Sequence, residues 1–287
     1  MRTRGERALQ ALGWVGGTAV VAFAVLPLWY VVVLSLAPDP AGTGLWPRGL
    51  TLDNYRALAS PAFGFYPALR HSVLLSTGTT VVSLLVAIPA AYALVRLPVP
   101  GRAQILAAML ALAFFPGVLL LLPLRLRAAQ LDWLDRLPTI GFAQLSFTLP
   151  LAVWFLAYAF RQVPDEVVEA AVLDGAGTRQ RIVRVILPMA RPAVAATSVV
   201  VFVFSWNDFL FSSGLSESSS SETLPVTLSK LPTLGFLGGQ MAAAVLMSVP
   251  VALVVGALLW LLASRTDVYR PRADRRRRLT RFSTPRR

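Results

Sequence analysis

Long apolar stretches alternate with short polar segments along this 287-residue chain. A helix that crosses the hydrocarbon core of a membrane needs about 20 predominantly apolar residues. Only one of the qualifying stretches contains a charged residue, Asp208, and none is long enough for two spans and a turn. The pattern therefore predicts an all-α integral membrane protein with six transmembrane helices. The six stretches are 8–38, 71–95, 103–124, 137–160, 192–216 and 231–264.

Composition agrees with a membrane class. Hydrophobic residues make up 56% of the chain and charged residues 14%, and the mean hydropathy is +0.64. Neighbouring helices can satisfy the backbone groups that a proline leaves unpaired in lipid, so we expect the spans to continue through their prolines. These are Pro27, Pro89, Pro116, Pro123 and Pro250. Residues 1–264 are predicted to form one transmembrane domain.

Basic residues are distributed unequally between the two sides of such a membrane domain. With six spans, both termini and the segment 161–191 fall on one side, which collects 20 of the 27 lysines and arginines. The other side collects 7, whereas the acidic residues divide evenly, 7 and 7. Because basic residues accumulate on the cytoplasmic side, we expect the termini and 161–191 to be cytoplasmic.

The high isoelectric point, about 11.4, raises the question of nucleic-acid binding. The arginines flank the spans instead of forming a stripe with interleaved aromatic residues, so no nucleic-acid partner is expected. The exception is the tail 265–287, which contains four consecutive arginines at 275–278. We expect this basic cytoplasmic tail to anchor the chain at anionic membrane lipids.

The segment 161–191 contains a pattern typical of two short helices joined at a glycine. Pro164 suits the first turn of a helix, and Asp165 and Glu166 would lie at its positive end. Gly175 permits a left-handed bend, and Thr178 is placed to cap a second helix. Such an elbow would present small alanines and carboxylates to a partner. An ordinary solvated loop between spans is the alternative.

The spacing of the same residues resembles a known signature. Glu169-Ala170-Ala171 is followed by three residues, Gly175, nine residues and Val185-Ile186-Leu187-Pro188. This resembles the EAA motif of the membrane subunits of binding-protein-dependent ABC importers, and Asp174-Gly175-Ala176 is similar to the form common in carbohydrate importers. The resemblance implies that this loop couples the permease to an ATPase. The implied coupling residues are Glu169, Ala170, Ala171, Asp174, Gly175 and Ala176.

Further stretches resemble sugar-importer permeases, in particular those of maltose systems. They are 51–55, 224–228 and 241–244. The resemblance implies a bacterial or archaeal inner-membrane protein that works with two ATP-binding subunits, a second homologous permease and an extracytoplasmic binding protein. ATP and Mg²⁺ would bind to the partner ATPases, and this chain would hold no cofactor. The segment 216–222 in the loop 213–239 is rich in serine and glutamate, and we expect it to be mobile.

Asp208 is the one carboxylate inside a predicted span, beside Asn207 and Trp206. Ionisable groups within membranes usually face a bundle interior or water. One interpretation places Asp208 near the outer end, with Trp206 as an interfacial belt residue. The other places Asn207 and Asp208 on the translocation path or at its outer gate.

Enzymatic chemistry has little support in the sequence. There is no Walker A loop and no Gly-x-Ser-x-Gly, the single histidine, His71, is expected to be structural, and cysteine is absent. The chain is therefore expected to be a transport subunit, not an enzyme. A secondary transporter or channel is the alternative function, but that class predicts several intramembrane carboxylates or inverted repeats.

Overall fold

The computed structural model describes residues 4–47, 49–232 and 235–266, and all regular structure within them is helical. Four helices are long and apolar enough to cross a membrane singly, and two bent pairs raise the number of candidate spans to six. The four are α1 (Arg4–Leu36), α3 (Phe65–Arg96), α6 (Leu137–Arg161) and α13 (Leu237–Thr266). The prediction of an all-α membrane fold is confirmed. The basic tail beyond residue 266 lies outside the described residues.

The predicted span 103–124 is broken. It consists of α4 (Arg102–Ala113) and α5 (Gly117–Gln130), whose axes are bent by 85°. Pro116 lies at the break with an extended backbone, ψ 110°, and not inside a helix as predicted. Proline lacks an N–H and disfavours helical geometry in the residue before it, here Phe115, so the helix ends before that residue. The remaining prolines of the predicted spans, Pro27, Pro89, Pro123 and Pro250, lie inside helices.

The predicted span 192–216 is also interrupted. α10 (Arg191–Trp206) ends before Asn207, and a new helix, α11 (Leu210–Leu215), begins three residues later. The side chain of Asp208 accepts hydrogen bonds from the backbone N–H groups of Phe211 and Ser212. Asparagine and aspartate side chains compete with the helical backbone in this way, and the local polar residues therefore start a second helix.

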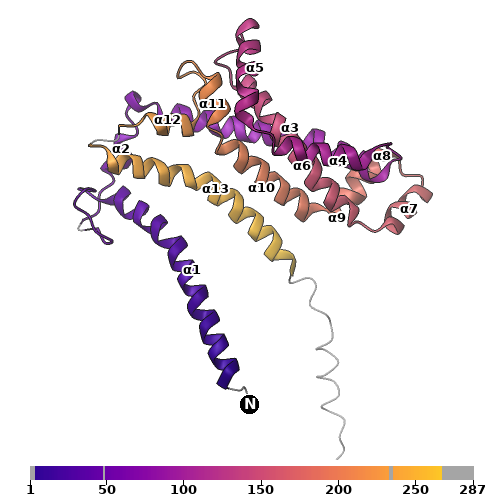
Figure 1. Ribbon diagram of the computed structural model, residues 1–287, viewed down its shortest axis with the longest axis horizontal. Helices are drawn as coiled ribbons and strands as arrows, with labels where there is room; N and C mark the ends of the chain where they lie inside the picture. Colours follow the sequence, from indigo (N-terminus) through magenta and orange to yellow (C-terminus); the bar gives the residue numbers. More distant parts are fainter. Residues whose placement is uncertain (1–3, 48, 233–234, 267–287) are drawn as a thin grey trace, which may run out of the picture.

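The core lies where α3 packs along α6 and α10 (Figure 1). Ala87 and Ala91 of α3 and Ala152 of α6 are fully buried. Small residues allow helix axes to approach closely, which favours association inside a membrane. In contrast, α1 packs mainly on α13, and both helices diverge from the α3–α6–α10 core. Much of α1 is therefore exposed.

Short elements gather at the two ends of α3. One end, here called the loop end, carries α2 (Asp53–Ala57), the 3₁₀ turn η1 (Pro61–Phe63), α12 (Leu224–Lys230) and the segment 216–223. The other, here called the elbow end, carries the segment between α6 and α10. That segment consists of α7 (Asp165–Leu173), α8 (Thr178–Gln180), the π-helical turn η2 (Arg181–Ile186) and α9 (Leu187–Met189).

Candidate functional site

The bend of the elbow is formed by the backbone around Gly175. Gly175 has φ +77°, which side-chain-bearing residues rarely adopt. Its N–H donates to the carbonyl of Val172 (3.0 Å), and the N–H of Ala176 donates to the carbonyl of Ala171 (2.9 Å). These two bonds are the pair that closes a Schellman motif at the end of a helix. The local sequence thus ends α7 and turns the chain.

The two halves of the elbow begin close to the predicted positions. Asp165 and Glu166 occupy the first turn of α7, with Pro164 in the capping position. The second half differs by one residue: Gly177, not Thr178, precedes α8, and its N–H donates to Oε1 of Gln180 (2.9 Å). Thr178 is the first helical residue, so the predicted threonine cap is wrong, a shift within the usual uncertainty of helix ends.

One face of the elbow packs on the end of the bundle. Val163, Val168 and Ile186 are buried in the cluster that also contains α3 and α6 residues. The opposite face is open: Glu169, Ala170, Asp174 and Gly175 are exposed, and Ala171 and Ala176 are half-buried. The elbow therefore places all six implied coupling residues in one short segment.

Leu173 is an exposed apolar residue of the elbow that is not among the predicted coupling residues. It is the last residue of α7, and its side chain is 89% exposed. Its outward direction follows once Val168 is known to be buried, because the five positions between them correspond to a rotation of about 140° around a helix. Val172 beside it is also exposed. Together, Val172 and Leu173 form an exposed apolar knob, flanked along the chain by the exposed carboxylates Glu169 and Asp174.

A second candidate site is a cavity of about 430 Å³ beside the break between α10 and α11. Its volume lies within the range of small-molecule sites, which combine apolar and aromatic walls with a few polar groups. Both predicted residues, Asn207 and Asp208, line it. The other lining residues are Gly117, Gln144, Phe147, Thr148, Val203, Phe204, Ser205, Phe209, Leu210 and Phe211.

Asp208 is held by a network of hydrogen bonds. Its Oδ2 accepts from Nε2 of Gln144 (3.1 Å) and from the backbone and hydroxyl of Ser212 (both 3.1 Å). Gln144 in turn accepts from Thr79 of α3 (3.2 Å) and Ser205 of α10 (2.5 Å). Buried polar groups are stable when they are paired in this manner. The sequence did not single out Gln144, which connects three helices through one amide.

The two neighbours of Asp208 differ in environment. Asn207 is exposed, and its amide donates to the carbonyl of Val203 (2.8 Å). Trp206 is only 1% exposed, and its indole N–H donates to the carbonyl of Met247 in α13 (3.2 Å). The interpretation of Trp206 as an interfacial belt residue is therefore wrong: it is a packing residue that joins α10 to α13.

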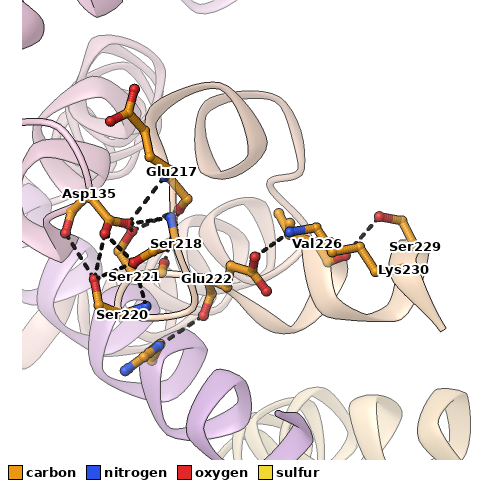
Figure 2. A network of polar contacts seen from close by, with 11 residues as sticks. Asp135, Glu217, Ser218, Ser220, Ser221, Glu222, Val226, Ser229 and Lys230 are labelled. Atoms are coloured by element: carbon orange, nitrogen blue, oxygen red, sulfur yellow. Dashed lines mark hydrogen bonds and ion pairs between the residues drawn. The ribbon is translucent and has the colours of Figure 1, made fainter. Parts of the chain in front are cut away.

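The serine-rich segment 216–222, predicted to be mobile, is instead organised around Asp135 (Figure 2). Asp135, between α5 and α6, accepts from the hydroxyls of Ser220 (2.7 Å) and Ser221 (2.6 Å) and from the backbone of Ser218 (3.1 Å). Ser221 is fully buried. Partial burial raises the pKa of Asp135, but the hydrogen bonds from the serines outweigh this and hold it far below its usual range. These hydrogen bonds were not predictable from the segment itself, because the acceptor comes from a distant loop.

The loop end is further fixed to α3. The imidazole Nδ1 of His71 lies 2.9 Å from the carbonyl oxygen of Glu222, and the hydroxyl of Ser72 accepts from the N–H of Leu224 (2.7 Å). Glu222 also forms an ion pair with Lys230. His71 thus has a structural contact, as the sequence suggested. Among the described residues, no group of acidic or histidine side chains could hold a metal ion.

The chain is similar to known transport proteins over most of its length. Residues 60–268 match the family model of the binding-protein-dependent transport system inner membrane component. The chain is 32% identical over 248 residues to the trehalose transport system permease protein SugB of Mycobacterium tuberculosis, covering 83% of this chain and 89% of the relative. It is 31% identical over 252 residues to the trehalose/maltose transport system permease protein MalG of Thermococcus litoralis, covering 86% of this chain and 90% of the relative.

A solved structure agrees with the fold. A chain of a bacterial ABC transporter involved in the import of the acidic polysaccharide alginate superposes with a TM-score of 0.75 at 22% identity, covering 90% of this chain and 98% of that chain. The matched family consists of ABC permease subunits, in which ATP hydrolysis belongs to a separate subunit, so the alternative of a self-sufficient transporter or channel is set aside. This chain belongs to the family of binding-protein-dependent transport system inner membrane components and is a membrane permease subunit, not an enzyme.

Proposed function

We propose that this permease imports a sugar as one of a pair of homologous permease subunits, driven by two ATP-binding subunits that hold ATP and Mg²⁺. The sugar class is supported by relatives named for trehalose and maltose transport. An extracytoplasmic binding protein delivers the solute, in keeping with the family. The excess of basic residues on one side supports a cytoplasmic location for both termini and the elbow, where an ATPase can reach them.

In this function the elbow docks on the ATPase and couples hydrolysis to transport. The observation that carries the proposal is the exposed surface at the end of α7, where Leu173 stands beside Glu169 and Asp174. Ala170 permits close approach of the partner, and Gly175 permits the bend. Burial of one leucine side chain contributes about 1.5–3 kcal/mol, and a hydrogen bond to a charged group a similar amount.

The cavity at the break between α10 and α11 is the part of the translocation path that this subunit contributes. Phe147, Phe204 and Phe209 offer apolar faces to a sugar ring, and Asn207 and Asp208 offer polar groups. The exposed amide of Asn207 is the group freest to bind a passing hydroxyl, since Asp208 is already engaged with Gln144.

Reconstitution in proteoliposomes tests this function. The chain is purified with its partner subunits, the binding protein is added, and uptake of radiolabelled trehalose, maltose and diacetylchitobiose is measured with ATP. ATP-dependent uptake of one of these sugars by the complex, and none by the chain alone, is expected. Full-rate uptake by the chain alone would contradict the requirement for partners.

Orientation is tested by single cysteines in this naturally cysteine-free chain. A membrane-impermeant maleimide should label Gly177→Cys only from the cytoplasm and Ser219→Cys only from outside. The reverse pattern would refute the topology.

A further inference from the structure

Arg96, the last residue of α3, is a largely buried cation at the elbow end. Its side chain is 9% exposed. Nη2 donates to the carbonyl oxygens of Phe160 (2.8 Å) and Val163 (2.5 Å), and Nη1 forms an ion pair with Asp165. One guanidinium therefore contacts the end of α6, the connecting turn and the first turn of α7.

These contacts match the chemistry of the guanidinium group. The last carbonyls of a helix lack intrahelical partners and form its negative end, which attracts a cation. Arginine presents a planar fork of five donors, so it can bind several oxygens in one plane, whereas lysine acts as a point charge. A cation so little exposed is stable only while it is paired. If the elbow moved without α3, Arg96 would lose its contacts with Val163 and Asp165 together and would keep only its bond to Phe160 of α6.

α3 extends this connection to the rest of the molecule. It is a helix of 32 residues, about 48 Å long. Near its middle, Thr79 bonds Gln144 and Ser83 lies 3.0 Å from the hydroxyl of Thr148, and both partners line the cavity. At its far end, Ser72 accepts from the N–H of Leu224 at the loop end. A displacement of Arg96 is thus a displacement of the helix that contacts both the cavity wall and the loop end.

We propose that Arg96 is a positioning residue that ties the elbow to α3, so that movement of the elbow on its ATPase is passed to the cavity. This inference rests on the proposed role of the elbow as the ATPase docking site. It assigns a role to a residue outside the elbow motif. It also predicts that docking and coupling are separable, because loss of the Arg96 contacts should leave the ATPase bound to the elbow while its movement no longer reaches the cavity.

The experiment uses the whole complex in proteoliposomes, with Phe204→Cys at the cavity as the reporter. The rate of maleimide labelling is compared without ATP and after trapping the ATPases with ATP and vanadate. The variants are Arg96→Gln, Arg96→Lys and Asp165→Asn. Arg102→Gln is the matched control, because Arg102 is an exposed arginine near the same end of α3.

In the parent and in Arg102→Gln, trapping should change the labelling rate by about fivefold or more, the usual lower range of coupling between sites. In Arg96→Gln the change should vanish although the ATPase subunits still co-purify and hydrolyse ATP. Arg96→Lys should retain part of the change, since it keeps the pair with Asp165 but loses the fork. Asp165→Asn should also retain part, since the bonds to Phe160 and Val163 remain.

A merely structural Arg96 would lower the yield of assembled complex and leave the labelling response of the remaining complex intact. An unchanged response in Arg96→Gln therefore overturns the inference. Gly175→Val distinguishes failure of the Arg96 tie from failure of the elbow as the docking site. If it abolishes ATPase binding while Arg96→Gln behaves as the parent, the elbow function stands and the tie fails. If Gly175→Val and Glu169→Ala together also leave the response unchanged, the proposed elbow function fails.

Discussion

The bend at Gly175 gives the sharpest prediction about the elbow. Gly175 has φ +77°, and a Cβ built there would have no atom within 4 Å. A substitution therefore meets open space, and its cost comes from the backbone alone. An L-residue in the left-handed region costs about 1–2 kcal/mol, with β-branched residues at the upper end. Asparagine adopts this region more readily than other side chains.

For Gly175→Val, about 2 kcal/mol of backbone strain corresponds to a roughly 30-fold shift away from the native bend. That shift breaks the pair of hydrogen bonds from Gly175 and Ala176 to the last turn of α7. The knob at Leu173 immediately precedes the bend, so its position is lost with it. Gly175→Ala should be intermediate, at about 1 kcal/mol, and Gly175→Asn should be close to the parent.

The assay is titration of purified ATPase subunit onto the permease in nanodiscs. The affinity for the ATPase subunit should decrease in the order parent, Gly175→Asn, Gly175→Ala, Gly175→Val. The Gly175→Val variant should bind about 10- to 30-fold more weakly than the parent. Membrane insertion should be equal for all four, because the site lies outside the spans. Affinities close to that of the parent for both Gly175→Val and Gly175→Asn would show that the left-handed bend is not needed for binding. Equally poor binding by both variants would also refute the backbone explanation, because the site would then tolerate no side chain at all.

Three further predictions concern other parts of the molecule. Leu173→Ala should weaken ATPase binding by about tenfold or more in the same titration, since a buried leucine is worth about 1.5–3 kcal/mol; an unchanged affinity would remove Leu173 from the interface. Asp208→Asn should destabilise the junction of α10 and α11 by about 1–3 kcal/mol, because it leaves donors such as Gln144 unpaired, and should lower the thermal midpoint of the purified complex. The order imposed by Asp135 should be constant from neutral pH down to about pH 4, the usual unfolded pKa, and should be lost as the pH falls through the depressed folded pKa. Limited proteolysis at segment 216–222 should report this, and Asp135→Asn should expose the segment at neutral pH whereas Asp132→Asn should not.

Much of the architecture was predictable because it depends on local sequence. A run of about 20 apolar residues must be helical in lipid, since no water is present to satisfy the backbone. The helix–Gly–helix elbow follows from residues within two turns of one another, with the bend at Gly175, a glycine that adopts a positive φ. The helix breaks at Pro116 and at Asn207–Phe209 were not predicted, because both spans were expected to continue through these positions.

The remaining features depend on contacts between residues far apart in the chain. Asp135 orders serines more than 80 positions away, and Arg96 reaches carbonyls more than 60 positions away. Polar composition alone indicates mobility for residues 216–222, and a basic residue at a span end indicates only a membrane anchor.

The sequence by itself determined the membrane class, the approximate spans and the position of the elbow, because hydropathy, proline and glycine act on the backbone where they stand. Only the tertiary structure decided which polar groups became partners, that Leu173 faces outward, and that Gln144 and Arg96 join separate helices. Such pairings arise when packing brings distant segments together and excludes water from them, so their energies have no counterpart in any local pattern.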